Sequence, residues 1–441
     1  MTSILTTGSR RAALVLLTLA APLTSCDLSV PDPNSTTQDD AFNTRAGLIV
    51  AVTGLENQYK TQALSSYLLT TGITSRELAA DNTFANLLDL DIGGAGLATN
   101  NGNVAGYFRE MYQTISTATD IIEGATGVEN VSPELRARLI ATAEFYKAAA
   151  LGALAIGFTD VALNTSRTEP VSYVGRQAGF EEANRLLASA EGRLAGGAEA
   201  DLLNRVRAYR ARFELFAGNL DEALAAANRV DPARLSVFTY QEGADNPLYQ
   251  GISPIVGQPS FAVRDNLGLA DVEAGDGRID YFTEPNPDTS PNGLPIETAT
   301  GFIVGDPFAP SGPVGPRGSI PAFVPDEMAL IRAEVFARRS QTADAVREIN
   351  SVRQDAADPL GLVPNLGPYT GPTDLQSLLD EIYYNRSTEL YLQGLRLEDA
   401  RRLNQGSPET GNPFQRTRNF YPFPEQERLA NPTTTPADPA I

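Results

Sequence analysis

The chain has 441 residues, of which 42% are apolar, enough to form the core of one large domain or of two ordinary ones. Its formal charge is −20 at pH 7 and no basic cluster offsets this charge, so we expect no binding to nucleic acid or to anionic membrane surfaces. The sequence contains no histidine, which excludes nucleophile pairs that need histidine and also excludes histidine metal sites.

The 54 acidic residues are numerous enough to include the carboxylate pair of a glycosidase. However, no spacing between acids singles out such a pair, and no G-x-x-x-x-G-K-[ST] phosphate loop is present. We therefore expect a solvated acidic surface, with no catalytic residue, no metal site and no cofactor.

The first 25 residues have the pattern of a secretory signal peptide: Arg10 and Arg11 precede an apolar run from Ala12 to Leu23. This run is shorter than the about 20 residues that cross a bilayer. The sequence Leu-Thr-Ser-Cys that ends at Cys26 resembles the bacterial lipobox, in which the cysteine is acylated after cleavage. We predict a signal peptide over 1–25, lipidation at Cys26, a flexible tether over 26–40, and membrane attachment through the lipid anchor only.

The following 200 or so residues show helical periodicity in several segments. Apolar residues recur at helical spacing over 48–59 and again over 104–122. A third helix is predicted to begin at Ser132, because Ser132 is a favourable N-cap, Pro133 suits the first helical position and Glu134 suits the first turn. Residues 71–103, which are polar and contain glycine, are expected to form a loop between these helices.

Two helix hairpins have the turn chemistry of tetratricopeptide pairs. The first spans 199–230 and turns at Gly218, and the second spans 326–353. The segment between them, 235–325, is rich in Pro, Gly, Asn and Asp and lacks helical periodicity. We predict a mainly α fold in which tetratricopeptide-like helix pairs form a frame, with 235–325 as a loop-rich irregular insert. Residues 41–441 would form one domain, with the frame at 41–234 and 326–441.

Two runs in the second half of the chain are distinctive. Residues 276–282 read Asp-Gly-Arg-Ile-Asp-Tyr-Phe, and residues 381–402 read Glu-Ile-Tyr-Tyr-Asn-Arg-Ser-Thr-Glu-Leu-Tyr-Leu-Gln-Gly-Leu-Arg-Leu-Glu-Asp-Ala-Arg-Arg. Together with 27–34, 320–334, 421–424 and 431–432, they resemble the SusD/RagB family of outer-membrane nutrient-binding lipoproteins. The resemblance covers nearly the whole mature chain. The chain departs from the family pattern at Asn385 and Gln393, where the family usually has acids.

The resemblance implies a function as well as a fold. Such a protein binds glycans or other oligomeric nutrients, either an oligosaccharide or a peptide, and it is not an enzyme. It implies a partner, a SusC-like TonB-dependent β-barrel transporter, over which the lipoprotein sits as a lid. It also implies that the protein is lipid-anchored in the outer membrane and faces the cell exterior.

Two segments are the expected ligand-binding region. The first is comparable to a loop that borders the site in family members, and the second belongs to the insert; the residues are Glu77, Asp81, Asn82, Phe84, Tyr281 and Phe282. Aromatic rings stack on sugar faces, and Asn or Asp side chains bind hydroxyls beside them. The chain has no Trp, so stacking would use its Tyr and Phe residues. The alternative, that Phe84 and Phe282 are core residues, stays open.

The charged C-terminal run suggests either a structural or a catalytic role. Arg396 and Asp399 lie about one helical turn apart, and charged residues near a core usually pair for structural reasons. We predict a structural clamp that ties the last helices to the frame, formed by Glu389, Arg396, Asp399 and Arg402.

Two other functions compete with nutrient binding. A tetratricopeptide-type scaffold lipoprotein of the cell envelope would have tandem repeats, whereas the two hairpins here are separated by the insert. A carboxylate-pair glycosidase is the second alternative, and it would lose turnover but keep binding when one acid is changed to its amide.

Overall fold

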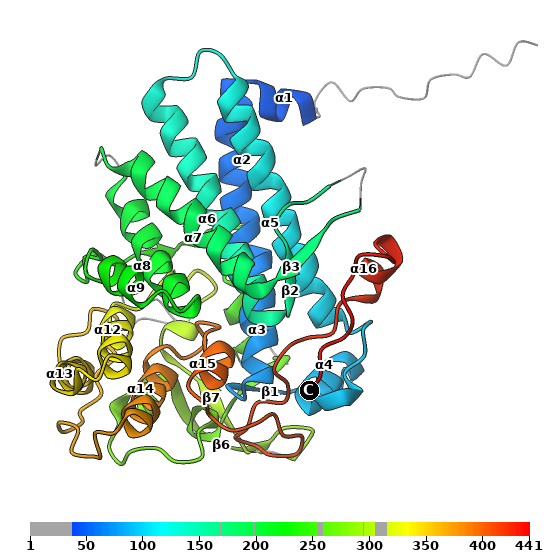
Figure 1. Cartoon of the computed structure of the whole chain (residues 1–441). Coiled ribbons are helices and arrows are strands. Elements are labelled where there is room, and N and C mark those ends of the chain that lie inside the picture. The colour runs from blue at the N-terminus through cyan, green and yellow to red at the C-terminus, as the bar shows by residue number, and fades with distance from the viewer. Residues whose placement is uncertain (1–37, 167–169, 197–198, 254–258, 294, 305–314) are drawn as a thin grey trace, which may run out of the picture. The chain divides into compact units, whose positions relative to one another are not determined.

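The structure, a computed structural model, describes residues 38–166, 170–196, 199–253, 259–293, 295–304 and 315–441. The predicted signal peptide, the predicted lipidation site at Cys26 and most of the predicted tether lie outside the described residues. The described part is mainly helical (Figure 1), so the predicted fold class is confirmed.

The chain enters the fold through the short helix α1 (Gln38–Asn43), followed by an almost continuous helical rod. The elements of the rod are α2 (Arg45–Gln58), the π-helical turn η1 (Tyr59–Ala63) and α3 (Leu64–Thr74). The Thr44 hydroxyl caps α2 by accepting a hydrogen bond from the Gly47 amide at 3.0 Å. The predicted helix at 48–59 is confirmed, but the rod continues to residue 74 because the buried apolar face continues through Leu64 and Leu68.

Two long helices pack beside this rod (Figure 1): α5 (Gly102–Gly127) and α6 (Pro133–Gly157). The predicted start of the third helix is confirmed, because the Ser132 hydroxyl accepts a hydrogen bond from the Leu135 amide at 3.3 Å. By length and composition, α6 is the one helix of the described residues that is able to cross a membrane. Its most apolar window is 100% buried inside the protein, so α6 is a core helix.

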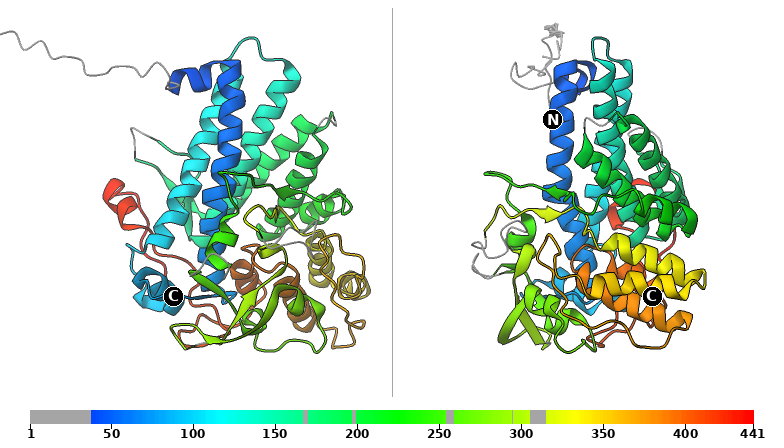
Figure 2. Two further views of the ribbon diagram at one scale, coloured as in Figure 1. Left: turned by 180° about the vertical axis from the view of Figure 1, so that it is seen from behind. Right: turned by 90° about the vertical axis from the view of Figure 1, so that its left-hand side faces the viewer.

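After α6, each further helix of the frame packs against the one before it. These helices are α7 (Arg176–Leu194), α8 (Ala200–Phe216), α9 (Leu220–Ala227), α12 (Glu327–Arg338), α13 (Thr342–Arg353) and α14 (Leu375–Glu389). Both predicted hairpins are confirmed, as α8–α9 and α12–α13, and Gly218 has the positive φ of 81° that its turn requires. Although about 100 residues separate the hairpins in sequence, α9 packs against α12 (Figure 2). The second hairpin therefore extends the helical array that the first one begins.

The insert contributes most of a four-stranded antiparallel sheet, with strand order β1-β5-β7-β6. The strands are β1 (Leu78–Ala80), β5 (Phe261–Arg264), β6 (Thr283–Thr289) and β7 (Pro295–Ala299). Two further pairs are β2 (Asp160–Ala162) with β3 (Tyr173–Gly175), and β4 (Val237–Phe238) with β8 (Ile320–Pro321). The remaining elements are η2 (Gly94–Gly96), α10 (Pro247–Ile252), η4 (Asp265–Gly268), α11 (Gly277–Phe282), η5 (Gly301–Ile303), α15 (Arg396–Arg402) and α16 (Glu425–Ala430).

The expectation that 71–103 is a loop was wrong. This segment contains the end of α3, the strand β1 and the helix α4 (Ala85–Ile92). All three residues of β1 are buried, and α4 buries Leu87 and Leu90. Because β1 pairs with β5, which lies about 180 residues further along the chain, its strand conformation depends on a partner that local sequence does not reveal.

Candidate functional site

Three of the predicted ligand-binding residues come together directly after β1: Asp81, Asn82 and Phe84, which we call the edge patch. The Asp81 amide donates to the Ser260 carbonyl at 2.9 Å, which continues the pairing between β1 and β5. The Asn82 amide nitrogen Nδ2 donates to Ser260 Oγ at 2.9 Å. These contacts fix the backbone of the edge patch to the sheet.

Asn82 also positions Phe84, because Asn82 Oδ1 accepts a hydrogen bond from the Phe84 amide at 3.0 Å. Phe84 is the N-cap residue of α4, and it is 64% exposed. Partial burial, together with the nearby Asp288, raises the pKa of the Asp81 carboxyl. The patch thus presents an aromatic ring, an amide and a carboxyl group at one surface, a combination that suits contact with a sugar ring and its hydroxyls.

The other three predicted ligand residues have different surroundings. Glu77 is 1% exposed, and its two carboxylate oxygens accept hydrogen bonds from the Leu392 amide at 2.9 Å and the Ser75 hydroxyl at 2.8 Å. Phe282 has no exposed surface and packs edge-on against Phe302, with ring centroids 5.2 Å apart. In this conformation neither residue presents a surface to a ligand, and we assign both to the interior.

Tyr281 is half-buried, and its hydroxyl donates to the Leu360 carbonyl at 2.9 Å. This contact ties α11 to the loop that follows α13. The structure therefore brings Asp81, Asn82 and Phe84 together but gives Tyr281 a supporting contact elsewhere. A ligand role for Tyr281 stays a prediction.

Two of the four predicted clamp residues, Asp399 and Arg402, lie in one buried network of ion pairs. Asp399 accepts from Arg386 Nε at 2.9 Å and from Arg402 Nη2 at 2.6 Å. Arg402 also pairs with Glu334 of α12. These contacts link α14, α15 and α12, and we call Glu334, Arg386, Asp399 and Arg402 the C-terminal cluster.

Arg396 and Glu389, the other two predicted clamp residues, have separate partners. Arg396 donates to the Leu267 carbonyl at 2.5 Å and to the Ser387 carbonyl at 2.7 Å. Glu389 Oε2 accepts from Arg278 Nη1 at 3.3 Å. Sequence reasoning missed Arg386 and Glu334, because only the folded chain shows which arginine faces which acid. A stability measurement, described in the Discussion, tests the structural role.

A cavity of about 610 Å³ lies between α5, the β2–β3 pair and α16. Its wall includes the rings of Phe108, Tyr112 and Tyr173 together with the polar side chains of Arg109 and Glu427. Tyr173 donates to Glu427 Oε1 at 2.6 Å. The volume is in the range of small-ligand sites, about 300–1,000 Å³. Residue patterns did not indicate this cavity, because its wall combines segments that are far apart along the chain.

No protein-family model matches the sequence, and no curated protein sequence matches it either. Solved structures do match its fold. A SusD superfamily protein from Bacteroides vulgatus has a TM-score of 0.67 at 15% identity, and the match covers 90% of this chain and 99% of that one. A SusD-like carbohydrate binding protein from Bacteroides fragilis has a TM-score of 0.66 at 16% identity, with 90% and 100% covered.

A third match is the surface glycan-binding protein A from Bacteroides thetaiotaomicron in complex with laminarihexaose. Its TM-score is 0.66 at 14% identity, and the match covers 89% of this chain and 99% of that one. The chain therefore has the mainly helical fold of SusD superfamily proteins. The resemblance predicted from the sequence is confirmed at the level of fold.

Proposed function

We propose that the protein is a SusD-like surface lipoprotein that binds a neutral glycan and passes it to a TonB-dependent transporter of the outer membrane. The observation that carries this proposal is the match of about nine-tenths of the chain to SusD-like proteins, one of which holds laminarihexaose. We favour a neutral ligand because the formal charge of −20 would repel acidic polysaccharides.

The edge patch is the proposed glycan-binding surface. Phe84 offers an exposed ring, and Asn82 holds the backbone amide of Phe84 at 3.0 Å, so the ring is displayed from a fixed turn. An ordered binding surface loses less conformational entropy when a ligand binds. Asp81 adds a carboxyl that can accept hydrogen bonds from sugar hydroxyls.

The test is the affinity of the purified mature protein for a panel of neutral oligosaccharides that includes laminarihexaose, measured by calorimetry. Phe84→Ala should weaken binding by about fivefold or more, since stacking on an aromatic ring is worth roughly 1 kcal/mol or more. Phe414→Ala is the matched control, because Phe414 is also exposed and its amide also donates to the side chain of an asparagine two residues before it.

Other outcomes would relocate the site or reject the ligand class. Loss of binding only in Arg109→Ala would move the site to the cavity beside α5, and loss only in Phe414→Ala would move it to the loop around 409–417. Binding of peptides and of no glycan in the panel would overturn the glycan proposal.

Delivery to a transporter is tested separately, by mild detergent extraction and affinity capture of the tagged protein from its native outer membrane. One β-barrel of the TonB-dependent type in stoichiometric amount is the expected result. Cys26→Ala should abolish membrane attachment while leaving glycan affinity unchanged. Recovery of the protein without a barrel would contradict the transport role.

The proposal includes no catalysis. The glycan-binding neighbours support a binding role, and the chain lacks the histidine that many hydrolytic sites use. A bound oligosaccharide should therefore be recovered with its length unchanged after prolonged incubation, as chromatography of the products would show. Shortened products that disappear in an acid-to-amide variant would establish a glycosidase instead.

A further inference from the structure

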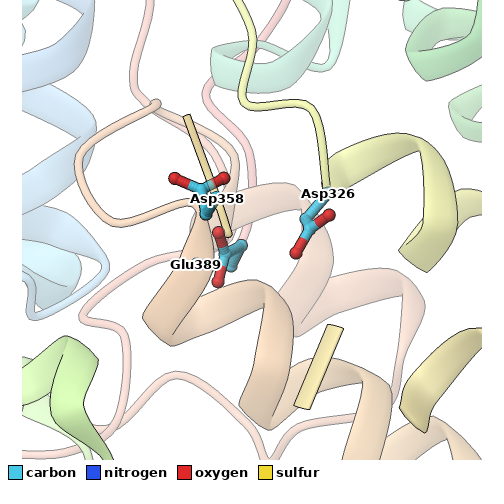
Figure 3. Close-up of side chains that lie close together, drawn as sticks. All are labelled: Asp326, Asp358 and Glu389. Atoms are coloured by element: carbon cyan, nitrogen blue, oxygen red, sulfur yellow. The ribbon is translucent and has the colours of Figure 1, made fainter. Parts of the chain in front are cut away.

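Three carboxylates from distant parts of the chain meet in the interior: Asp326, Asp358 and Glu389, which we call the carboxylate triad (Figure 3). Asp326 directly precedes α12, Asp358 lies in the loop after α13, and Glu389 is the last residue of α14. One oxygen of each carboxylate lies within 4.8 Å of the corresponding oxygens of the other two.

The oxygens of the carboxylate triad are not fully paired. Glu389 is 0% exposed and Asp358 is 7% exposed. Among the described residues, Glu389 Oε1, Asp358 Oδ2 and Asp326 Oδ2 have no hydrogen-bond partner. A buried carboxylate that is only partly paired is costly unless a cation or a proton compensates the rest of its charge.

Protein cations compensate only part of this charge. Arg278 lies 3.3 Å from Glu389 Oε2, but its guanidinium is also bonded to Asp276, with Nη2 at 2.7 Å from Asp276 Oδ2. Within the described residues, neither Asp326 nor Asp358 is within ion-pair distance of an arginine or a lysine. The Arg278 guanidinium therefore pairs with two acids, Asp276 and Glu389, and leaves the other two without an ion-pair partner among the described residues.

Each buried carboxylate is held by one oxygen and leaves the other free. Asp358 Oδ1 accepts from the Leu360 amide at 2.7 Å and from the Leu362 amide at 3.1 Å. Tyr281 fixes the same loop through its hydrogen bond to the Leu360 carbonyl. Hydrogen bonds that orient a ligand side chain through its other oxygen are typical of metal sites in proteins.

We propose that Asp326, Asp358 and Glu389 together bind one calcium ion, which joins α12 and α14 to the loop after α13. Calcium takes oxygen ligands at 2.3–2.6 Å, so two ligands on opposite sides of the ion lie about 4.6–5.2 Å apart. The spacing of 4.8 Å or less therefore lets all three oxygens contact one ion. Magnesium fits less well, because it requires ligands at about 2.0–2.1 Å in a strict octahedron.

Protons are the competing occupant. Burial raises the pKa of Asp326 to about 7 and that of Asp358 to about 6, and it also raises the pKa of Glu389. Protons and a cation would therefore compete for the same oxygens. A calcium ion here would depart from the expectation of no metal site. The sequence did not suggest such a site, because three acids about 30 residues apart form no metal motif.

The experiment uses the mature protein after treatment with EDTA, at pH 8, with calcium chloride as the only added ligand. Calorimetry should show one calcium ion per chain, and calcium should raise the melting temperature by several degrees, more than equimolar magnesium does. Asp358→Asn keeps the size of the side chain and should weaken calcium binding at least about tenfold. Asp280→Asn makes the same change at a nearby exposed residue and should leave binding intact.

Two results would overturn the proposal. One is wild-type protein that shows neither heat nor a change in melting temperature up to about 10 mM calcium, which exceeds the range of weak extracellular sites. The other is Asp358→Asn protein that binds calcium as the wild type does, which would place the ion elsewhere. If Asp358→Asn does not fold, Asp326→Asn gives the same test at a partly exposed residue. No glycan is present, so failure here leaves the proposed function untouched.

Discussion

The C-terminal cluster and the edge patch differ in how their acidic side chains are paired. In the cluster, Asp399 is 2% exposed and each of its oxygens accepts from an arginine. In the edge patch, Phe84 is 64% exposed, and Asp81 has no ion-pair partner among the described residues.

This difference distinguishes residues that maintain the fold from residues that are available to a ligand. A buried carboxylate that is paired on both oxygens contributes to the fold, because removing it leaves buried cations without their partner. A surface group that is anchored on one side only keeps bonding capacity for a ligand. The four predictions below test this distinction, beginning with the largest expected change in the free energy of unfolding.

Asp399→Ala should give a loss of stability that none of the other variants exceeds. The change leaves the guanidinium groups of Arg386 and Arg402 buried without their shared carboxylate. Breaking a buried pair in this way costs about 3–5 kcal/mol. Urea denaturation measures the loss, and glycan affinity of the folded fraction should be unchanged. An unchanged melting temperature with lost binding would show that the cluster belongs to the binding site.

Phe282→Ala should also destabilise the protein, by about 3–5 kcal/mol, the usual cost of removing a buried phenylalanine ring. Phe282 packs against Phe302 and against Tyr391, with ring centroids 5.2 and 5.1 Å apart. Its predicted ligand role requires a different result, namely a lower glycan affinity at nearly unchanged stability. Denaturation and calorimetry on the same preparation distinguish the two.

Local signals in the sequence were sufficient where structure depends on neighbouring residues. Ser132 with Pro133 predicted the start of α6, and Gly218 predicted the turn between α8 and α9. They were insufficient where structure depends on distant partners. The pairing of Leu78 with Val263 makes β1 a strand, and the pairing of Arg402 with Glu334 completes the C-terminal cluster.

The candidate site divides in the same way. Asp81, Asn82 and Phe84 are neighbours in sequence, so one loop assignment placed all three. Glu77 precedes them by only a few residues, but its carboxylate is buried and accepts a hydrogen bond from the Leu392 amide, which lies far along the chain. Residue type and spacing therefore could not predict which side chains in this segment are exposed and which are buried.

The carboxylate triad gives a third prediction, of intermediate size. Because burial raises the pKa of Asp358 to about 6, the folded, calcium-free protein holds this proton more tightly than the unfolded chain does. The contribution of protonated Asp358 to the free energy of unfolding is therefore lost as pH rises from about 4 through 6. Asp326, whose pKa is raised to about 7, extends this loss toward pH 7.

The measurement is urea denaturation in EDTA at pH 5 and at pH 8, with wild type and Asp358→Asn compared. Asparagine keeps the acceptor for the Leu360 amide but carries no charge. Between pH 5 and pH 8, the free energy of unfolding of the variant should rise by about 1–2 kcal/mol relative to that of the wild type. Equal pH dependence in the two proteins would show that Asp358 titrates normally and is not a strained, buried acid.

Asn82→Ala should have the smallest effect on stability, since its side chain makes one hydrogen bond to Ser260 and one to the Phe84 amide in a partly exposed position. We expect a loss of about 1 kcal/mol or less, as for other partly solvated hydrogen bonds. Glycan affinity should fall more than stability does, because Phe84 is then displayed from a looser turn. Asn412→Ala is the matched control, since Asn412 Oδ1 holds the Phe414 amide at 2.9 Å in the same manner. If both variants lost affinity equally, the ligand would contact both turns, and the glycan-binding surface would extend beyond the edge patch.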